Sequence, residues 1–187
     1  MLKNFFEFLK VVVISLLIIL PIRYFIIQPF YVKGASMEPT FHDHEYLIID
    51  EISYRFNRPQ RGEVIVFRYP FNPQEYFIKR IIGLPGEKID LVDGDIFVYN
   101  NENPDGLKLD ESLYLAENVR TYNIEDDIIE LKENEYFVLG DNRYASKDSR
   151  TFGPLDETFI TGKVLLRGWP FSRFTVFNYS DAYQFNN

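Results

Sequence analysis

The sequence predicts a mainly β protein with an N-terminal single transmembrane helix, an antiparallel β core and a small inserted subdomain of strands and loops. Three observations predict this fold class. An apolar run lies near the N-terminus, short β-branched and aromatic runs separated by turn residues follow it, and an acidic stretch interrupts these runs in the second half of the chain. The 187 residues suffice for one domain with one hydrophobic core.

The apolar run covers residues 11–27, and residues 5–9 add further apolar side chains before it. As a helix, the run spans roughly 26 Å, and the added residues bring it to the thickness of a bilayer. A cleavable signal peptide is one alternative, but it needs a small-x-small site soon after the apolar stretch, and the residues after Leu20 are bulky. A buried helix of a soluble protein is the other. We favour an uncleaved anchor, with residues 1–30 forming a cytoplasmic stub and the transmembrane segment.

The charges around this run predict its orientation. Lys3 and Lys10 lie on its N-terminal side, where Glu7 is the only acidic residue. Because an excess of basic residues marks the cytoplasmic side, we expect the N-terminus in the cytoplasm and residues 31–187 outside it.

Seven later segments have the length and composition of β-strands, with β-branched and aromatic residues bounded by turn residues. The Asp93-Gly94 pair between two of them is typical of a tight hairpin, because both central residues of a type I′ turn need a positive φ. The predicted strands are residues 45–50, 63–69, 76–82, 88–92, 95–99, 135–139 and 163–167.

The acidic residues are concentrated in one segment. The chain carries 20 basic and 28 acidic residues, a net charge of −8, and residues 101–135 hold 11 of the acidic and 3 of the basic ones. The net charge argues against a nucleic-acid-binding protein that relies on a basic surface. We interpret the acidic stretch as a solvated excursion within an inserted subdomain at about residues 95–134, and an acidic docking surface for a basic partner is the alternative.

The residue types limit the chemistry. The chain has no cysteine, which excludes disulfides, thiolate metal sites and a cysteine nucleophile. A Ser-His-Asp triad would have to use His42 or His44, the only two histidines, which lie six and eight residues after Ser36 in one turn. A zinc site at these histidines lacks an obvious third ligand, and no glycine-rich phosphate motif is present. We expect neither a metal nor a cofactor.

Ser36 lies in the turn-forming segment GASMEPT, residues 34–40, only nine residues after Ile27. At most about 30 Å of extended chain separates the two, so Ser36 is expected close to the membrane surface. A serine in an ordinary Gly/Pro turn is the alternative reading of this segment.

Lys79 lies in the predicted strand 76–82. Alternation places it on the same face as Phe77 and Ile81, with Arg80 on the other face. Desolvation disfavours the ammonium form and lowers the pKa of a lysine, which lets the amine act as a base near neutral pH. A lysine that reaches solvent from an amphipathic strand is the alternative.

A third polar segment, GDNRYASKDSR, covers residues 140–150 directly after the predicted strand 135–139. Its composition indicates an internally hydrogen-bonded loop, and a solvated surface loop is the alternative. A serine in this loop could hold a neutral lysine amine by a hydrogen bond. Because the other routes to hydrolysis are poorly supplied, a serine activated by a lysine remains.

Together these segments resemble type I signal peptidases, the membrane-bound Ser/Lys proteases that remove signal peptides from exported proteins. The similarity spans nearly the whole chain in the right order. It comprises an N-terminal anchor, GASMEPT, RGEVIVFRYP (residues 61–70), KRIIGLPGE (residues 79–87), GDNRYASKDSR and a closing RGWPF (residues 167–171). One anchor and a short insertion are similar to the Gram-positive form. A lysine at position 79, where endoplasmic-reticulum relatives have histidine, favours a bacterial enzyme.

The resemblance implies a role for each candidate residue. Ser36 would be the nucleophile and Lys79 the general base, neutral in the resting enzyme, and the backbone N–H of Ser36 would donate to the oxyanion. Some members have a serine where this chain has Gly34, so the second oxyanion donor is missing or comes from elsewhere, and His44 stands where glycine is common. The supporting residues would be Ser146, which orients the Lys79 amine, and Arg80, Asp141, Asp148 and Arg150, which hold the loop.

The family further implies an antiparallel β catalytic core with an inserted cap-like subdomain, held in the bacterial cell membrane. The expected partners are the lipid bilayer and signal-peptide-bearing preproteins, which would bind as an added β-strand and be cut after an Ala-x-Ala site. A non-catalytic homologue that serves as an assembly factor or chaperone for surface proteins is an alternative from another class. A self-cleaving Ser/Lys repressor is opposed by the membrane segment and by the lack of a DNA-binding region.

Overall fold

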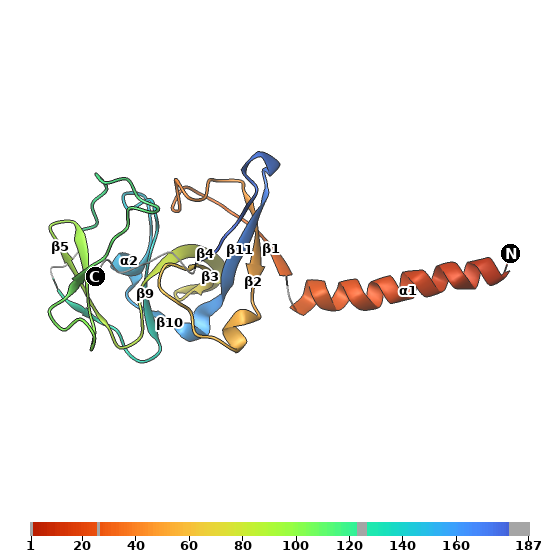
Figure 1. Ribbon diagram of the computed structural model, residues 1–187, viewed down its shortest axis with the longest axis horizontal. Coiled ribbons are helices and arrows are strands. Elements are labelled where there is room, and N and C mark those ends of the chain that lie inside the picture. The colour runs from red at the N-terminus through yellow and green to blue at the C-terminus, as the bar shows by residue number, and fades with distance from the viewer. Residues whose placement is uncertain (1, 26, 123–126, 180–187) are drawn as a thin grey trace.

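The computed structural model describes residues 2–25, 27–122 and 127–179. Helix α1 (Leu2–Phe25) comes first, and Figure 1 shows it extending away from the strands as a single rod. Within these described ranges, no helix is both long and apolar enough to cross a membrane. The crossing predicted at residues 11–27, of which residue 26 lies outside the described residues, stays a prediction.

The strands form two antiparallel sheets. The large sheet has the order β1-β2-β11-β3-β4-β9-β10, with β12 paired to β11. Its strands are β1 (Ile27–Tyr31), β2 (Tyr46–Asp50), β3 (Val64–Tyr69), β4 (Asn72–Gly83), β9 (Glu135–Leu139), β10 (Leu155–Asp156), β11 (Ile160–Trp169) and β12 (Thr175–Val176). Its connections hold helix α2 (Ser149–Phe152) and 3-10 turns at Ser53–Arg55, Glu157–Phe159 and Phe171–Arg173.

The large sheet curls so that strands far apart in its order approach each other. β2, β11 and β3 lie between β1 and β4 in the sheet, yet the rings of Phe30 in β1 and Tyr76 in β4 are 5.3 Å apart, edge to face. A cluster of buried apolar side chains, which includes Met37, Phe41 and Ile78, packs against this curled sheet. The curl brings the segment that follows β1 next to β4.

The small sheet has the order β7-β6-β5-β8 and lies at the end of the molecule opposite α1 (Figure 1). Its strands are β5 (Lys88–Val92), β6 (Asp95–Tyr99), β7 (Leu107–Lys108) and β8 (Ile129–Glu130). The β5–β6 turn has the predicted conformation, with φ of 53° at Asp93 and 87° at Gly94. Ile89 and Ile96 of the small sheet pack with Phe137 of β9 in one buried cluster, which joins the two sheets.

The mainly β fold class is confirmed. Each predicted strand is present, and β5, β6 and β9 have the predicted bounds. The strands β1, β7, β8, β10 and β12 were not predicted. Four of these are two residues long, too short to show an alternating pattern.

Strand β1 differs from the prediction for another reason. Its residues continue the apolar run that was assigned to the anchor, and a short apolar stretch fits a helix and a strand equally well. Pro29 decides between them, because proline has no N–H and disfavours the helical conformation of the residue before it. A proline is tolerated here because β1 is an edge strand.

Candidate active site

Ser36 lies in the turn that follows β1. Buried side chains fix the turn: Met37 is 1% exposed and Phe41 is fully buried, and the Phe41 N–H donates to the Met37 carbonyl oxygen at 2.8 Å. The Val32 N–H donates to the Glu45 carbonyl oxygen, which ties the segment to the start of β2. Ser36 itself is half-buried and lines a groove.

The backbone around Ser36 includes two residues in the left-handed region. Gly34 has a φ of 90°, and its N–H donates to the Asp43 carboxylate at 2.9 Å. His44 has a φ of 68°, a conformation that favours glycine. Among the residues that the structure describes, no hydrogen bond uses the Ser36 N–H. This N–H is therefore available to donate a hydrogen bond to an oxyanion. Gly34 has no side-chain hydroxyl that could serve as a second donor.

Lys79 reaches the Ser36 side chain from β4. Its Nζ lies 2.8 Å from the Ser36 Oγ and donates to the Ile78 carbonyl oxygen at 2.7 Å. The lysine is only 3% exposed. Burial lowers the pKa of Lys79 to about 8, although the carboxylates of Asp148 and Asp141 act to raise it. A substantial fraction of the amine is therefore neutral near pH 8, as a base requires.

Arg80 and Asp141 form a buried pair beside the Ser36 turn. Arg80 Nε and Nη2 donate to the two Asp141 carboxylate oxygens at 2.9 and 2.7 Å. The Thr40 hydroxyl donates to the same carboxylate at 2.5 Å, and Arg80 Nη1 donates to the Gly62 carbonyl oxygen at 2.9 Å. The pair joins β4, the loop at residues 140–150 and the turn that bears Ser36.

Asp148 and Arg150 hold the same loop from within. The Arg150 guanidinium donates to both Asp148 oxygens at 2.8 Å, and the Gly140 N–H donates to Asp148 Oδ2 at 3.0 Å. Burial acts to raise the pKa of Asp148, but these donors outweigh it and the pKa lies below its ordinary value. Asp148 is therefore a carboxylate at neutral pH.

Ser146 lies beside Gly140, with its hydroxyl oxygen buried. The Ser146 Oγ and the Ser36 carbonyl oxygen both lie against the position that a Cβ on Gly140 would occupy. The Ser146 hydroxyl contributes to the lowered pKa of Asp148, and within the described part of the chain no hydrogen bond joins it to Lys79. The predicted contact of Ser146 with the lysine amine stays a prediction.

The loop contributes two residues that the sequence did not single out. The Asn142 N–H donates to the Ser36 carbonyl oxygen at 3.1 Å, and its side-chain amide donates to the Ala35 carbonyl oxygen at 3.1 Å. Arg143 Nε donates to the Gly140 carbonyl oxygen at 3.0 Å. Both residues stand in the quoted GDNR motif. A loop's composition does not reveal which of its polar side chains reach another segment, so only the motif could have found them.

A groove passes Ser36 and Lys79 between the end of β1 and the middle of β4. Because β1 is an edge strand, its outer side can pair with a further strand. The groove is lined by Phe30, Tyr31, Val32, Lys33, Ser36, Glu75, Tyr76, Phe77, Ile78, Lys79 and Lys147.

The two histidines follow Ser36 in the same segment, and each lies beside a different carboxylate. His42 lies 3.3 Å from a Glu38 oxygen, and His44 lies 3.3 Å from an Asp43 oxygen. The described residues contain no group of three or more side chains that could hold a metal ion.

Comparison with known proteins gives consistent matches. The family model of signal peptidase, peptidase S26, matches residues 5–169. Signal peptidase IB of Staphylococcus aureus is 34% identical over 189 residues, which covers 92% of this chain and 93% of the relative. A probable signal peptidase I-2 of Synechocystis is 34% identical over 176 residues, covering 91% and 76%. The crystal structure of a signal peptidase I from Enterococcus faecalis is 31% identical, with a TM-score of 0.45, covering 57% of this chain and 97% of that one.

Proposed function

The chain belongs to the signal peptidase family, peptidase S26, and is a serine endopeptidase; we propose that it cuts exported preproteins after a small-x-small (Ala-x-Ala) site, with Ser36 as nucleophile and Lys79 as general base. The observation that supports this assignment most strongly is the 2.8 Å distance between the Lys79 Nζ and the Ser36 Oγ. A buried lysine with a lowered pKa, within hydrogen-bond distance of a serine hydroxyl, meets both requirements for activating that hydroxyl.

The reaction proceeds in two halves. The Ser36 Oγ attacks the scissile carbonyl carbon while its proton passes to the neutral Lys79 amine. The Lys79 ammonium then gives this proton to the leaving nitrogen, which releases the mature protein and leaves the signal peptide as an ester on Ser36. Water attacks the ester as Lys79 takes one of its protons. Collapse of the second intermediate frees the signal peptide as its carboxylic acid, which then loses its proton to solvent, while the Lys79 ammonium returns its proton to the Ser36 oxygen.

The Ser36 N–H supplies the first oxyanion donor. Its lack of a partner within the described residues supports this role. Asn142 holds the Ser36 and Ala35 carbonyl oxygens, which points the following N–H groups in a fixed direction. In other proteases one such donor contributes roughly 3 to 4 kcal/mol of transition-state stabilisation. Ser146 orients the Lys79 amine, and Arg80, Asp141, Asp148 and Arg150 keep the loop against it.

The preprotein binds in the groove as a strand added to β1. The groove lies between β1 and β4 and contains Ser36 and Lys79. Apolar side chains such as Phe77 and Ile78 line it and suit small apolar residues at the −1 and −3 positions.

The N-terminal apolar segment up to Phe25, where helix α1 ends, anchors the chain in the bacterial cell membrane by a single crossing, with the N-terminus in the cytoplasm. The eight residues between Ile27 and Ser36 then keep the site close to the membrane surface, where signal peptides emerge. Extraction of membranes from expressing cells with alkaline carbonate tests the anchor. We expect the full chain in the membrane pellet, and its release into the supernatant would contradict the anchor without affecting the assignment of the site.

The test of the function is the cleavage of a preprotein with an Ala-x-Ala site by the detergent-solubilised full chain, with the cut mapped by mass spectrometry. We expect a cut after the −1 alanine. Ser36→Ala and Lys79→Ala should each lower the rate at least about 1000-fold while the protein stays folded. Ser112→Ala is the matched control, since Ser112 is exposed and far along the chain from the groove residues, and should cleave at the wild-type rate.

The outcome that would overturn the proposal is equally specific. If neither this substrate nor a panel of surface-protein precursors is cut by the folded protein, the non-catalytic assembly factor becomes the better reading. Substantial cleavage by Ser36→Ala would instead leave the family assignment intact and reject Ser36 as the nucleophile.

A further inference from the structure

A buried ion pair joins the acidic stretch to the loop of the candidate active site. Glu111 follows β7 in residues 101–135, here called the acidic insertion, and Arg143 belongs to residues 140–150, here called the catalytic loop. Arg143 Nη1 and Nη2 donate to the two Glu111 carboxylate oxygens at 2.9 and 2.5 Å. The side chains are 15% exposed for Glu111 and fully buried for Arg143. This pair differs from the solvated surface that the sequence predicted for the insertion.

Arg143 transmits this contact to the backbone of the catalytic loop. The end of its guanidinium also donates from Nη1 to the Thr121 hydroxyl, a second residue of the insertion. Its remaining nitrogen, Nε, donates to the Gly140 carbonyl oxygen at 3.0 Å. The terminal nitrogens of the guanidinium thus bind the insertion, and its Nε binds Gly140.

Gly140 in turn lies against the nucleophile. The position of a Cβ on Gly140 falls against the Ser36 carbonyl oxygen and the Ser146 hydroxyl oxygen. The Gly140 N–H is held by Asp148 and its carbonyl oxygen by Arg143. Arg143 and Asp148 therefore fix the two peptide groups of Gly140 beside Ser36.

Glu111 is connected to a second arginine of the site. The Tyr114 hydroxyl donates to Glu111 Oε1 at 2.5 Å. The Arg80 guanidinium lies over the Tyr114 ring, with the Arg80 Cζ 3.9 Å from the ring centroid, in a cation–π contact. Arg80 is the partner of Asp141, which receives the Thr40 hydroxyl. One carboxylate of the insertion thus contacts two side chains that lead to adjacent residues of the catalytic loop, Gly140 and Asp141.

We propose that Glu111 is a positioning residue for peptide cleavage, acting through Arg143 and Tyr114 to hold Gly140 and Arg80 in the geometry that aligns Ser36 with Lys79. The guanidinium is charged at every working pH, and a buried charge without a counter-charge is strongly disfavoured. Without the Glu111 carboxylate, Arg143 turns toward solvent and releases the Gly140 carbonyl oxygen. This inference rests on the proposed function, since the aligned groups are those of the Ser36–Lys79 reaction.

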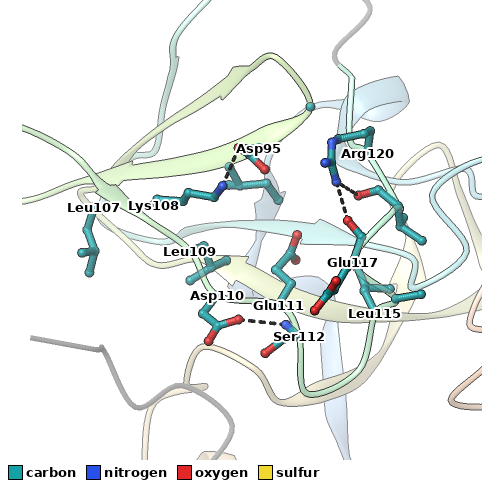
Figure 2. Close-up of a pocket in the computed structure, with 14 residues that line it drawn as sticks. Asp95, Leu107, Lys108, Leu109, Asp110, Glu111, Ser112, Leu115, Glu117 and Arg120 are labelled. Carbon is teal, nitrogen blue, oxygen red and sulfur yellow. Dashed lines mark hydrogen bonds and ion pairs between the residues drawn. The ribbon is translucent and has the colours of Figure 1, made fainter.

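The test compares two glutamates of the insertion. Glu111 and Glu117 line the same pocket (Figure 2), but Glu117 is exposed and no described side chain is paired with its carboxylate. Each is changed to glutamine in the full-length chain, and kcat and KM are measured on the Ala-x-Ala preprotein. We expect Glu111→Gln to lower kcat about tenfold, the size of one lost charge-assisted hydrogen bond. KM should stay within twofold, because no insertion residue lines the groove. Glu117→Gln should match the wild type in both constants.

A double-mutant cycle distinguishes positioning from general loss of structure. Because Glu111 acts through both Arg143 and Tyr114, Arg143→Met should lower kcat, and adding Glu111→Gln to it should lower kcat by clearly less than Glu111→Gln does alone. Multiplied losses in the double variant would overturn the proposal. So would a kcat of Glu111→Gln within twofold of the wild type, or an equal loss in Glu117→Gln.

A milder change covers the case in which Glu111→Gln does not fold. Thr121→Val keeps the shape of Thr121 but removes its hydrogen bond to Arg143. It should lower kcat about threefold with an unchanged KM, and a wild-type kcat in this variant would then overturn the proposal. Failure of the proposed function has a different result, because the wild-type chain itself would then leave the preprotein uncut.

Discussion

The Nζ of Lys79 lies 2.8 Å from the Oγ of Ser36, although 43 positions separate the two residues in the chain. The curl of the large sheet produces this contact, because it brings the turn after β1 beside β4 across three intervening strands. Lys79 is buried by the same closure. The fold thus creates the short distance and the lowered pKa together.

The burial of Lys79 predicts that removing its charge stabilises the protein. The pKa of Lys79 is about 8 in the folded protein, below its ordinary value of 10.5. The unfolded chain therefore binds the proton more tightly, which costs the folded state about 3 kcal/mol below pH 8. Lys79→Met loses two hydrogen bonds but removes this cost, and we expect the free energy of unfolding at pH 7 to rise by about 1 kcal/mol while cleavage is lost.

The pH dependence of that difference follows from the same shift. The penalty is fully present below the folded pKa and disappears as the pH rises toward 10.5, since the amine is then neutral in both states. Chemical unfolding of both proteins at pH 7 and pH 10.5 measures it. A Lys79→Met protein that is less stable than the wild type at pH 7 and more stable at pH 10.5 would contradict the account.

Gly140 is predicted to tolerate no side chain. A Cβ there would lie against the Ser36 carbonyl oxygen, which belongs to the backbone and cannot turn aside. Gly140→Ala should therefore destabilise the protein by about 1 to 3 kcal/mol and lower kcat. Gly168→Ala in β11 is the control, because the nearest atom to its Cβ is an ordinary 3.7 Å away. Thermal unfolding and cleavage assays on both variants check this, and equal effects of the two would reject the close approach.

The Arg80–Asp141 pair is predicted to be essential for stability. Its side chains are 6% and 0% exposed, so Asp141→Asn removes a buried carboxylate charge that accepts two hydrogen bonds from Arg80. We expect the free energy of unfolding to fall by about 3 kcal/mol. The exposed Lys88–Glu130 pair offers a comparison, and Glu130→Gln should cost less than about 1 kcal/mol. Denaturant titrations of both variants measure the difference, and a small effect at Asp141 would show that the pair is not structural.

Elements with a local pattern were predictable from the sequence. The β5–β6 hairpin is the clearest example, because alternating strands flank Asp93-Gly94 and both turn residues have the positive φ that the pair predicts. The strand β1 was not predicted, because its residues continue an apolar run. Pro29 is the local feature that disfavours a helix there, and pairing with β2 completes the strand. Two-residue strands such as β7 likewise exist only because a longer neighbour pairs with them.

The residues of the candidate site also differ in how far the sequence could predict them. Ser36 and Lys79 stood out because a polar residue in a tight turn and a lysine in an apolar strand both need a reason. The partners of Asn142 and Glu111 had no such signal. Glu111 meets Arg143 across 32 positions, and such pairing of charges has no sequence period. For that reason an insertion that looks merely acidic also supplies a buried contact to the site.

The measurement that tests the central claim most directly is the pH dependence of kcat/KM for cleavage of the Ala-x-Ala preprotein by the full-length protein. Only the neutral amine of Lys79 can take the Ser36 proton, so the rate should rise with pH through an apparent pKa of about 8 and then level off. A rate that does not change between about pH 6 and 9, or that appears only above about pH 10, where a solvated lysine loses its proton, would contradict Lys79 as a buried general base.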